Sequence, residues 1–499
     1  MGRPLILAVD QGTSSTKCLL VDDAGAIVAR GSAPVGERHP QPGWVEQDAN
    51  EIWISVRQAV AACLDGQPTK DLVSVGFSTQ RESAVVWDRR SGEPLSPVLS
   101  WQDQRTAAIC ETLRAAGAGR LVRERSGLPI DPMFSAAKAK WLLDTLDAGR
   151  ARARDGAIVV GTVDAFLMSR FGGEPVIEAG NASRTQLLNT RRAAWDPDLL
   201  ELFHVPVQAL PRVISSTGPF PQVRGLAPIP DGVPVHAVLG DSHAALFAHG
   251  ALSPGTVKAT FGTGSSVMGL VDSPEALDPG LCLTIAWSLE RPAFAAEGNI
   301  RASGSTLRWV AEILNVSVDE LAALADHASS DGVVLVPGFN GLGAPWWDDS
   351  AVGLLAGLTL GSSRGAIARA ALESIPHQVA DVVEAFDRSG ARVRELRADG
   401  GATRNDTLMQ LQADFIGRPV LRARTAELSA LGAAHLAGHA AGLWRLPDLV
   451  ALKREHDRFE PAVPPSQREA VRSHWAGAVS RSRDGTAPLP GGAFQRQAG

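Results

Sequence analysis

The segment Asp10–Lys17 places a turn rich in glycine and hydroxyl residues directly after an apolar run. Glycine and small hydroxyl residues, here including Thr13 and Ser14, let backbone N–H groups turn toward an anion, and Lys17 adds a positive charge. A carboxylate at the end of a strand, such as Asp10, can hold Mg²⁺ directly or through water. The segment therefore predicts a phosphate-binding turn, and a plain hairpin turn of the same composition is the alternative.

A second carboxylate, Asp241, follows the apolar run 235–240 and precedes a helical pattern. Side chains at such strand ends often face a cleft, where a carboxylate can accept a proton from a substrate hydroxyl. The same position suits the N-cap of a helix, for which aspartate is a favoured residue. This segment alone leaves both interpretations open.

Three further segments carry groups that could bind a small polar molecule. Adjacent Arg81 and Glu82 supply donors and carboxylate oxygens suited to neighbouring hydroxyls, with a solvated turn as the alternative. Trp101 could form the floor of a pocket or belong to the core. Two glycines at 400–401 would let a flat ring or a phosphate approach the backbone, although an ordinary strand-to-helix turn has the same composition.

The remaining sequence patterns argue against other phosphate-binding loops, a serine hydrolase and a zinc site. The sequence has no GxxxxGK[ST] segment and no GxGxxG segment that opens a helix, so phosphate binding must use hairpin turns. Gly361–Gly365 matches the GxSxG pattern of a serine hydrolase, but no oxyanion segment precedes it, and Ser363 also fits a helix cap. No cluster of His, Cys, Asp and Glu has the spacing of a zinc site.

The elements that must position these residues are short apolar strands mixed with helical patterns, which predicts an α/β fold. Helices are expected at 50–64, 303–314 and 364–386, and strands at 5–9, 18–21, 26–29, 73–78, 83–88, 235–240 and 333–338.

One internal repeat divides the chain. Residues 12–22 read GTSSTKCLLVD and residues 262–272 read GTGSSVMGLVD, and each copy follows an apolar strand. The copies lie half the chain apart, which indicates a duplication. We therefore expect two lobes that each offer a Gly-Thr turn to a shared cleft, the second turn being Gly262 and Thr263.

Composition excludes several classes of protein. The 499 residues carry a net charge of −6, whereas nucleic-acid binders usually have a basic surplus. The four cysteines are scattered without a CxxC pair, which fits a reducing compartment. No apolar stretch has the length of a membrane span, and the first apolar run is too short for a signal peptide. We expect a cytoplasmic protein that binds neither nucleic acid nor membranes.

Taken together, the motifs resemble the FGGY carbohydrate kinases, and among them the glycerol kinases. The resemblance runs in order from about residue 5 to about residue 475. The segments that carry it are AVDQGTSSTK, PGWVEQDANEIW, STQRESAVVWD, SWQDQRTAAIC, PMFSAAKAKWLLD, GTVDAF, NASRTQLLN, LGDSHAALF, FGTGSS, GFNGLGAPWWDD, GLLAGLTLGSSRGAIARAALESI and ADGGATRND.

The resemblance implies two actin-like (ribonuclease H-like) lobes with a central cleft for nucleotide and substrate. It places the first lobe at 1–248 and the second, nucleotide-binding lobe at 249–479, and we expect 480–499 to be a flexible tail. It implies ATP and Mg²⁺ as cofactors, a small polyol or sugar as substrate, and a possible homodimer or homotetramer.

Site roles follow from the matched motifs. Asp241 would be the catalytic base, and Asp10 and Asp241 would lie near Mg²⁺. The sugar or polyol would contact Arg81, Glu82, Trp101, Met133, Asp241, Ser242 and Ser266. The nucleotide would contact Thr13, Ser14, Lys17, Gly262, Thr263, Gly304, Arg308, Gly401 and Asn405.

Several positions depart from the glycerol kinase pattern. Met133 replaces a tyrosine, Ser242 a glutamine and Ser266 a phenylalanine, while Lys17 and Arg308 replace an arginine and a glutamine at the nucleotide. Smaller and more polar side chains predict a roomier pocket that suits a four- or five-carbon substrate. The predicted reaction is ATP-dependent phosphorylation of a primary hydroxyl. The alternatives are a non-catalytic sensor of nucleotide and sugar, and a ketose kinase of the xylulokinase type.

Overall fold

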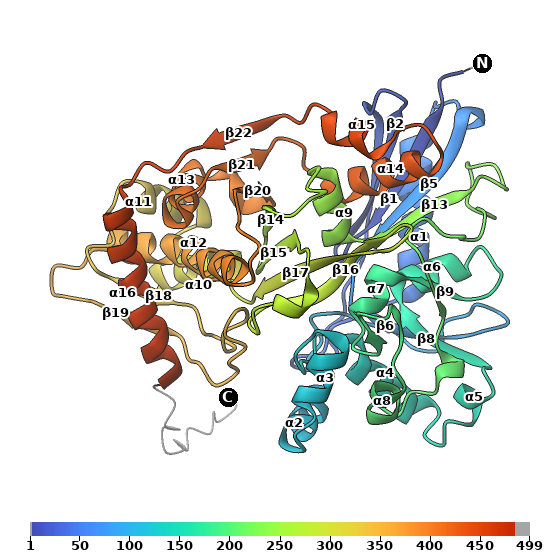
Figure 1. Cartoon of the computed structure of the whole chain (residues 1–499), viewed down its shortest axis with the longest axis horizontal. Coiled ribbons are helices and arrows are strands. Elements are labelled where there is room, and N and C mark those ends of the chain that lie inside the picture. Colours follow the sequence, from blue (N-terminus) through green and yellow to red (C-terminus); the bar gives the residue numbers. More distant parts are fainter. Residues whose placement is uncertain (1, 485–499) are drawn as a thin grey trace.

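The computed structural model describes residues 2–484, and each of its two lobes contains a large β-sheet (Figure 1). The first sheet has five strands in the order β13-β5-β1-β2-β3. β1, β2 and β3 form an antiparallel meander, whereas β5 is parallel to β1 and β13 is parallel to β5. The strands are β1 (Leu5–Gln11), β2 (Ser15–Asp22), β3 (Ile27–Pro34), β5 (Leu72–Thr79) and β13 (Val235–Gly240).

The second sheet has seven strands in the order β16-β17-β15-β14-β20-β21-β22. Five of them repeat the first sheet, since β17-β15-β14-β20-β21 has the order and relative directions of β3-β2-β1-β5-β13. The two Gly-Thr turns connect equivalent strands, as the sequence repeat predicts. The strands are β14 (Thr256–Phe261), β15 (Ser265–Leu270), β16 (Cys282–Ser288), β17 (Pro292–Ile300), β20 (Glu395–Asp399), β21 (Val420–Ala423) and β22 (His456–Phe459).

Smaller sheets and the helices complete the described chain. The small sheets are β4 (Glu46–Gln47), β7 (Val98–Leu99), β6 (Ala84–Asp88) and β8 (Ile158–Thr162); β9 (Val176–Glu178) with β12 (Arg212–Ile214); β10 (Leu188–Asn189) with β11 (Ala194–Trp195); and β18 (Val334–Val336) with β19 (Leu354–Ala356). The helices are α1 (Ala49–Leu64), α2 (Ala107–Ala115), α3 (Gly119–Ser126), α4 (Ser135–Leu146), α5 (Ala151–Arg154), α6 (Val163–Ser169), α7 (Ala179–Ser183), α8 (Pro197–Leu202), α9 (Asp241–Ala248), α10 (Gly304–Leu314), α11 (Val318–Asp326), α12 (Arg364–Arg388), α13 (Asp406–Ile416), α14 (Leu428–Ala440), α15 (Leu446–Ala451) and α16 (Pro465–Asp484). Short 3₁₀ turns occupy Thr69–Asp71, Val207–Ala209, Pro274–Ala276 and Gly401–Arg404.

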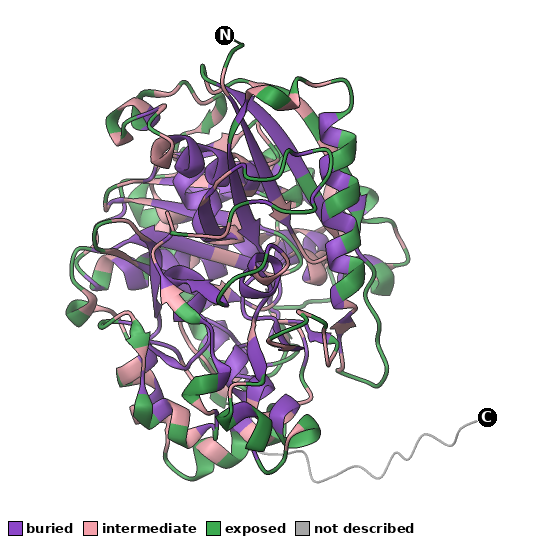
Figure 2. Ribbon diagram, turned by 90° about the vertical axis from the view of Figure 1, so that its right-hand side faces the viewer, coloured by how far each residue is buried: buried purple, intermediate pink, exposed green. Residues whose placement is uncertain are grey.

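The apolar run of β1 is continuous because both faces of the first sheet are covered. Leu5, Leu7 and Val9 pack into the cluster that contains the apolar residues of α1. Ile6 and Ala8 point the other way and pack into a cluster with the alanines of α14. Successive side chains of a strand alternate between faces, so a strand buried on both sides needs apolar residues throughout. The buried interior of both lobes is formed by the sheets and the helix faces that cover them (Figure 2).

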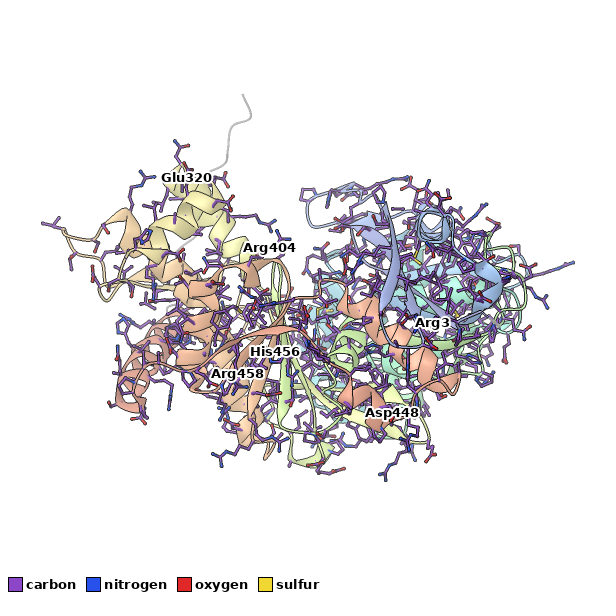
Figure 3. All side chains as sticks on the ribbon, turned by 90° about the horizontal axis from the view of Figure 1, so that it is seen from above. Arg3, Glu320, Arg404, Asp448, His456 and Arg458 are labelled. Atoms are coloured by element: carbon purple, nitrogen blue, oxygen red, sulfur yellow. The ribbon has the colours of Figure 1, made fainter. Side chains whose placement is uncertain are left out.

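The boundary between the lobes is less simple than the expected division at 248/249. α14 packs on β5, β1 and β13 of the first sheet and on α9, although it comes from the C-terminal half of the chain. Asp448 of α15 accordingly lies on the side of Arg3 and far from Glu320 of α11 (Figure 3). The residues of α14 and α15 therefore pack with the first lobe, contrary to their expected assignment to 249–479.

The prediction of a flexible tail at 480–499 is wrong for residues 480–484. Residues 480–484 form the last turn of α16, where Ser482 is buried and its hydroxyl donates a hydrogen bond to the backbone carbonyl of Val352. Residues 485–499 lie outside the described residues. Among residues 2–484, no helix combines the length and the apolar composition needed to span a membrane.

The contact between α14 and α9 leaves no room for a side chain at Gly432. A Cβ atom there would lie 1.8 Å from the carbonyl oxygen of Ala244, so Gly432→Ala must force the two helices apart. We expect a loss of about 3 kcal/mol or more in the free energy of unfolding, measured by chemical denaturation. Gly477→Ala is the matched control: a Cβ there meets nothing within 4 Å, so this change should stabilise α16 by about 0.5–1 kcal/mol. Equal effects of the two changes would contradict the prediction.

Candidate functional site

The carboxyl ends of the parallel strands of the first sheet bring Asp10 and Asp241 together. Asp10 lies opposite Ser78 in the register of β1 and β5, and Gly240 lies opposite Thr79 in the register of β13 and β5. Ser78 donates a hydrogen bond from its hydroxyl to Oδ1 of Asp10, at 2.9 Å. The two carboxylates are close enough for the charge of Asp241 to raise the pKa of Asp10. Both residues therefore lie at the ends of their strands, as the sequence predicts.

Asp241 is the first residue of α9, and the N-cap is Gly240, so the helix-cap interpretation of Asp241 is wrong. Its Oδ1 accepts hydrogen bonds from Nε of Arg81 at 3.1 Å and from the backbone N–H of Ser242 at 2.6 Å. No described residue donates a hydrogen bond to Oδ2, and the side chain is 40% exposed. Ser429 of α14 donates to the backbone carbonyl of Asp241 at 3.1 Å, which fixes the start of α9. Asp241 is held rigidly with one carboxylate oxygen free.

The surroundings of Asp10 favour its neutral form. Burial raises the pKa of Asp10 from 3.8 to about 7; the hydrogen bond from Ser78 opposes this rise, and the charge of Asp241 adds to it. Lys17 lies opposite Asp10 in the β1–β2 register and lowers the pKa, but its side chain is exposed. A carboxyl group in this state gains most from a nearby cation, because a cation stabilises the charged form that burial disfavours.

Asp10→Asn should therefore stabilise the protein in a pH-dependent way. Because the folded-state pKa lies above 3.8, the ionised carboxylate destabilises the fold as the pH rises from about 4, and the penalty is complete above about pH 7. We expect the variant to be about 1–3 kcal/mol more stable than the wild type at pH 8 and equally stable near pH 4. Denaturation curves between pH 4 and pH 8 measure this. The exposed Asp65→Asn change should leave the pH profile unaltered, and a gain that persists at pH 4 would contradict the explanation.

A buried network of charges lies beside Asp241. Arg81 donates from Nη1 and Nη2 to the two oxygens of Glu297, at 3.0 and 2.8 Å. Arg184 donates from Nε to Glu82 at 2.6 Å, and its Nη1 lies 2.9 Å from Glu297. Burial opposes ionisation of Glu297, yet the charges of Arg184 and Arg81 hold its pKa well below the usual range. Arg81 and Glu82, expected to face a substrate, are thus themselves almost fully buried and fixed by these partners.

The backbone of Glu82 adopts a conformation that few side chains tolerate. Its φ of 61° lies in the left-handed region, which is uncommon for residues other than glycine. The side chain is held by Arg184, and the backbone carbonyl accepts a hydrogen bond from Ser135 at 2.9 Å. Backbone strain of this kind is often kept at functional sites.

Trp101 links Ser83 to the first Gly-Thr turn, which contains Thr13. Its indole N–H donates to the hydroxyl of Thr13 at 3.1 Å, and its backbone N–H donates to Ser83 at 3.1 Å. Gln47 donates to the backbone carbonyl of Thr13 at 2.6 Å and is itself bonded to Gln80 at 2.9 Å. The turn is therefore supported from two sides, while Ser14 at its tip remains exposed.

One face of the second sheet is polar and points toward this network. Cross-strand partners share a face, and the register pairs Lys258 with Met268, Thr260 with Ser266, and Ser266 with Asn299. Glu297, two residues before Asn299, therefore belongs to the same face. The opposite face carries Val257, Ala259 and Phe261, which pack into the core with α12. The alternation of β14 explains why a lysine stands in an apolar strand.

Met133 packs in a cluster with Cys282, which is the cross-strand partner of Glu297. It is half-buried among Leu128, Phe134, Cys282 and Trp347. Its carbonyl accepts a hydrogen bond from the buried Lys138 at 2.6 Å. Burial lowers the pKa of Lys138 from 10.5 to about 8.

The second Gly-Thr turn meets the start of α10. Gly304 donates its backbone N–H to the carbonyl of Gly262 at 3.0 Å, and a Cβ at Gly304 would lie only 2.7 Å from that oxygen. Arg308 lies within 3.3 Å of the hydroxyl of Thr263. Gly262 and Thr263 are exposed at the tip of the turn. The second turn is therefore reachable by a ligand, as the first one is.

The turn after β20 approaches the end of β14. Gly400 has a φ of 99°, and a Cβ there would lie 2.4 Å from the carbonyl oxygen of Phe261, so the position requires glycine. Gly401 is exposed, with nothing within 4 Å of an added Cβ. Asn405 caps α13 by accepting a hydrogen bond from the backbone N–H of Leu408 at 2.7 Å. The structure brings this turn next to the strand that leads into the Gly262–Thr263 turn.

Sequence reasoning missed Arg184, Lys258 and Glu297. Each stands alone in an apolar or uncharged stretch, and a single charged residue within such a stretch, as in VKATF or FAAEGNI, was the available signal. The hydrolase alternative has no support, because the hydroxyl of Ser363 caps α12 by accepting from the N–H of Ala366 at 3.1 Å.

Comparisons with known proteins agree with this arrangement. Residues 5–248 match the N-terminal domain and residues 257–441 the C-terminal domain of the FGGY family of carbohydrate kinases. The chain belongs to this family. An apulose kinase of Pectobacterium atrosepticum is 44% identical over 97% of this chain and 99% of its own length. A glycerol kinase of Dechloromonas aromatica is 42% identical over 96% of this chain and 97% of its own.

Solved structures of FGGY kinases share the fold. A Plasmodium falciparum glycerol kinase with ADP has a TM-score of 0.88 at 27% identity and covers 96% of this chain and 98% of its own. A xylulose kinase of Rhodospirillum rubrum has a TM-score of 0.83 at 26% identity and covers 95% of this chain and 98% of its own. The expected two actin-like lobes are therefore confirmed.

Proposed function

We propose that the protein transfers the γ-phosphoryl group of ATP to a primary hydroxyl of a small sugar or polyol. The observation that carries this is the free Oδ2 of Asp241, since no described residue bonds it while Arg81 and the N–H of Ser242 hold Oδ1. Asp241 takes the proton of the substrate hydroxyl. At the same time the hydroxyl oxygen bonds to the γ-phosphorus, and the bond between the γ-phosphorus and the oxygen that bridges to the β-phosphate breaks. Family membership supports ATP as the phosphoryl donor.

The nucleotide site in this proposal lies between the two Gly-Thr turns. Thr13, Ser14 and Lys17 contact the phosphates from the first lobe. The second lobe contributes Gly262, Thr263, Gly304, Arg308, Gly401 and Asn405. The exposure of Ser14, Gly262, Thr263 and Gly401 supports this role, because backbone N–H groups of such turns are available to an anion.

We assign Mg²⁺ to Asp10 and Asp241. Mg²⁺ commonly uses one or two carboxylates together with water and substrate phosphates. Asp10 has one oxygen without a described partner that could face the ion, whereas Asp241 would reach it through water, which leaves its Oδ2 to accept the proton. The described residues contain no group of three or more His, Cys, Asp and Glu that could hold a metal, which agrees with a two-carboxylate site. When bound, Mg²⁺ would neutralise charge on the transferred phosphoryl group.

The sugar site comprises Arg81, Glu82, Trp101, Met133, Ser242 and Ser266 around Asp241. Because Glu297 and Arg184 immobilise Arg81 and Glu82, these two residues are preorganised to hold hydroxyl groups without a loss of side-chain freedom. The apulose kinase supports a ketose substrate, and the glycerol kinases support a polyol.

We further propose that the protein is cytoplasmic. The four cysteines are all free and buried, which fits a reducing compartment.

We also propose that the lobes divide at 248/249, apart from α14 and α15, and that the protein forms a homo-oligomer. Size-exclusion chromatography with light scattering measures the oligomeric state.

The proposed function is tested by ADP release with Mg·ATP and a panel of substrates. The panel contains glycerol, dihydroxyacetone, erythritol, threitol, xylitol, ribitol, arabitol, D- and L-xylulose, ribulose, apulose and gluconate. We expect turnover with a four- or five-carbon compound to exceed turnover with glycerol. Nucleotide binding without turnover of any compound would instead favour a non-catalytic sensor.

A further inference from the structure

The hydroxyl of Ser266 can only accept a hydrogen bond from a bound sugar. Its single proton is donated to Oε1 of Glu297 at 2.7 Å. Glu297 is fully buried, and both of its oxygens lie against the guanidinium of Arg81, which keeps it an ionised carboxylate without a proton to give. Ser266 is half-buried, so its remaining lone pairs are open to the site.

The hydroxyl of Ser242 has the opposite polarity. Its oxygen accepts a hydrogen bond from Nζ of Lys258 at 3.1 Å, and a lysine ammonium has no lone pair to accept one. No described residue accepts the proton of Ser242, which is half-buried beside Asp241. Lys258 is itself fixed, since it also donates to the hydroxyl of Thr260 at 2.7 Å.

The two serines border the same small region. Ser242 follows Asp241, whose Oδ1 is bonded to Arg81. Arg81 is bonded to Glu297, and Glu297 accepts from Ser266. Thr260, bonded to Lys258, is the cross-strand partner of Ser266. A ligand whose hydroxyl reaches Oδ2 of Asp241 therefore lies near a free donor on one side and a free acceptor on the other.

We propose that Ser242 and Ser266 select a ketose, with Ser242 donating to the ketone oxygen and Ser266 accepting from a hydroxyl. This inference rests on the proposed kinase function. A ketone oxygen accepts but cannot donate, so it pairs with Ser242 and not with Ser266. A polyol hydroxyl at the same place could also accept from Ser242, but its own proton would find no acceptor in Ser242 or in the ammonium of Lys258 behind it. The lysine charge behind Ser242 strengthens the donor, because a hydrogen bond polarised by a neighbouring bond to a charged group is stronger. The substrate therefore carries its carbonyl on the side of α9 and a hydroxyl on the side of β15.

The test compares each ketose with the polyol formed by its reduction, using D-xylulose with xylitol and dihydroxyacetone with glycerol. For the wild type we expect kcat/KM to be higher for the ketose. Ser242→Ala should lower kcat/KM for the ketose about tenfold more than for the polyol, and Ser242→Thr, which keeps the hydroxyl, should retain the ratio. Ser266→Ala should lower kcat/KM for both members of a pair about equally.

Ser265→Ala is the matched control. Ser265 is the neighbour of Ser266, but its hydroxyl is bonded to that of Ser303 at 2.8 Å on the other side of the strand, so the ketose-to-polyol ratio should not change. An unchanged ratio in Ser242→Ala, or a wild type that prefers the polyol, would overturn the inference while the kinase function stands. Absence of turnover with every compound in the wild type would overturn the kinase function itself.

Discussion

Replacing Asp241 with Asn should lower the turnover of sugar phosphorylation by about 10²–10⁴-fold in a protein that folds normally. The amide oxygen of the asparagine can still accept from Arg81 and from the N–H of Ser242, so the contacts that hold the side chain remain. The amide nitrogen takes the place of the free Oδ2 and cannot accept a proton. The chemical step should therefore fail while the geometry persists.

Steady-state kinetics and thermal denaturation of the same sample measure this prediction. The melting temperature should stay close to that of the wild type, and the loss should appear in kcat. Asp272→Asn is the control, because Asp272 is exposed and follows the end of β15 that lies opposite the Gly262–Thr263 turn, so its turnover should equal that of the wild type. Full activity of Asp241→Asn would remove Asp241 from the role of base.

The second large effect is expected for Glu297→Gln, which should destabilise the fold by about 3–5 kcal/mol. Glu297 is 0% exposed and lies against the guanidinium groups of both Arg81 and Arg184, which are also buried. Glutamine keeps the shape but removes the charge, so two buried cations remain with less compensation. Loss of one partner of a buried ion pair costs far more than loss of an exposed pair.

Chemical denaturation at pH 7 measures the change in the free energy of unfolding. Glu174→Gln is the matched control, because Glu174 is 61% exposed and its 3.0 Å pair with Arg212 is also exposed. That control should change stability by less than about 1 kcal/mol. A loss as small as this in Glu297→Gln would mean that the network adds little to stability. In that case Glu297 would serve mainly to position Arg81 and Ser266.

Local patterns predicted most of the elements that carry the site. The apolar runs of β1, β2, β3, β5 and β13 and the helical patterns of α1, α10 and α12 were identified because burial imposes a period of two or of 3.6 residues on the chain. The pairing of two Gly-Thr turns followed from the repeat, since equal turns between equal strands require similar residues.

The sequence did not predict the course of the chain after α13. Nothing in the composition of α14 indicates which sheet it covers, because an alanine-rich helix fits either lobe, and its place is decided by close contacts such as Gly432 against Ala244. The start of the tail was misjudged for a related reason. Polar residues 480–484 continue α16, whose packing against β18 and β19 is a long-range contact.

By itself the sequence determined which residues stand at the strand ends, since strand, turn and polar residue are neighbours in the chain. Asp10, Asp241 and the two Gly-Thr turns are of this kind. Only the tertiary structure decided how they are held. Arg81 meets Glu297 across 216 positions of the chain, and this contact fixes the orientation of Arg81, the polarity of Ser266 and the oxygen of Asp241 that stays free. Hydrogen-bond partners so distant in sequence are set by the packing of the two lobes, and residue spacing carries no information about them.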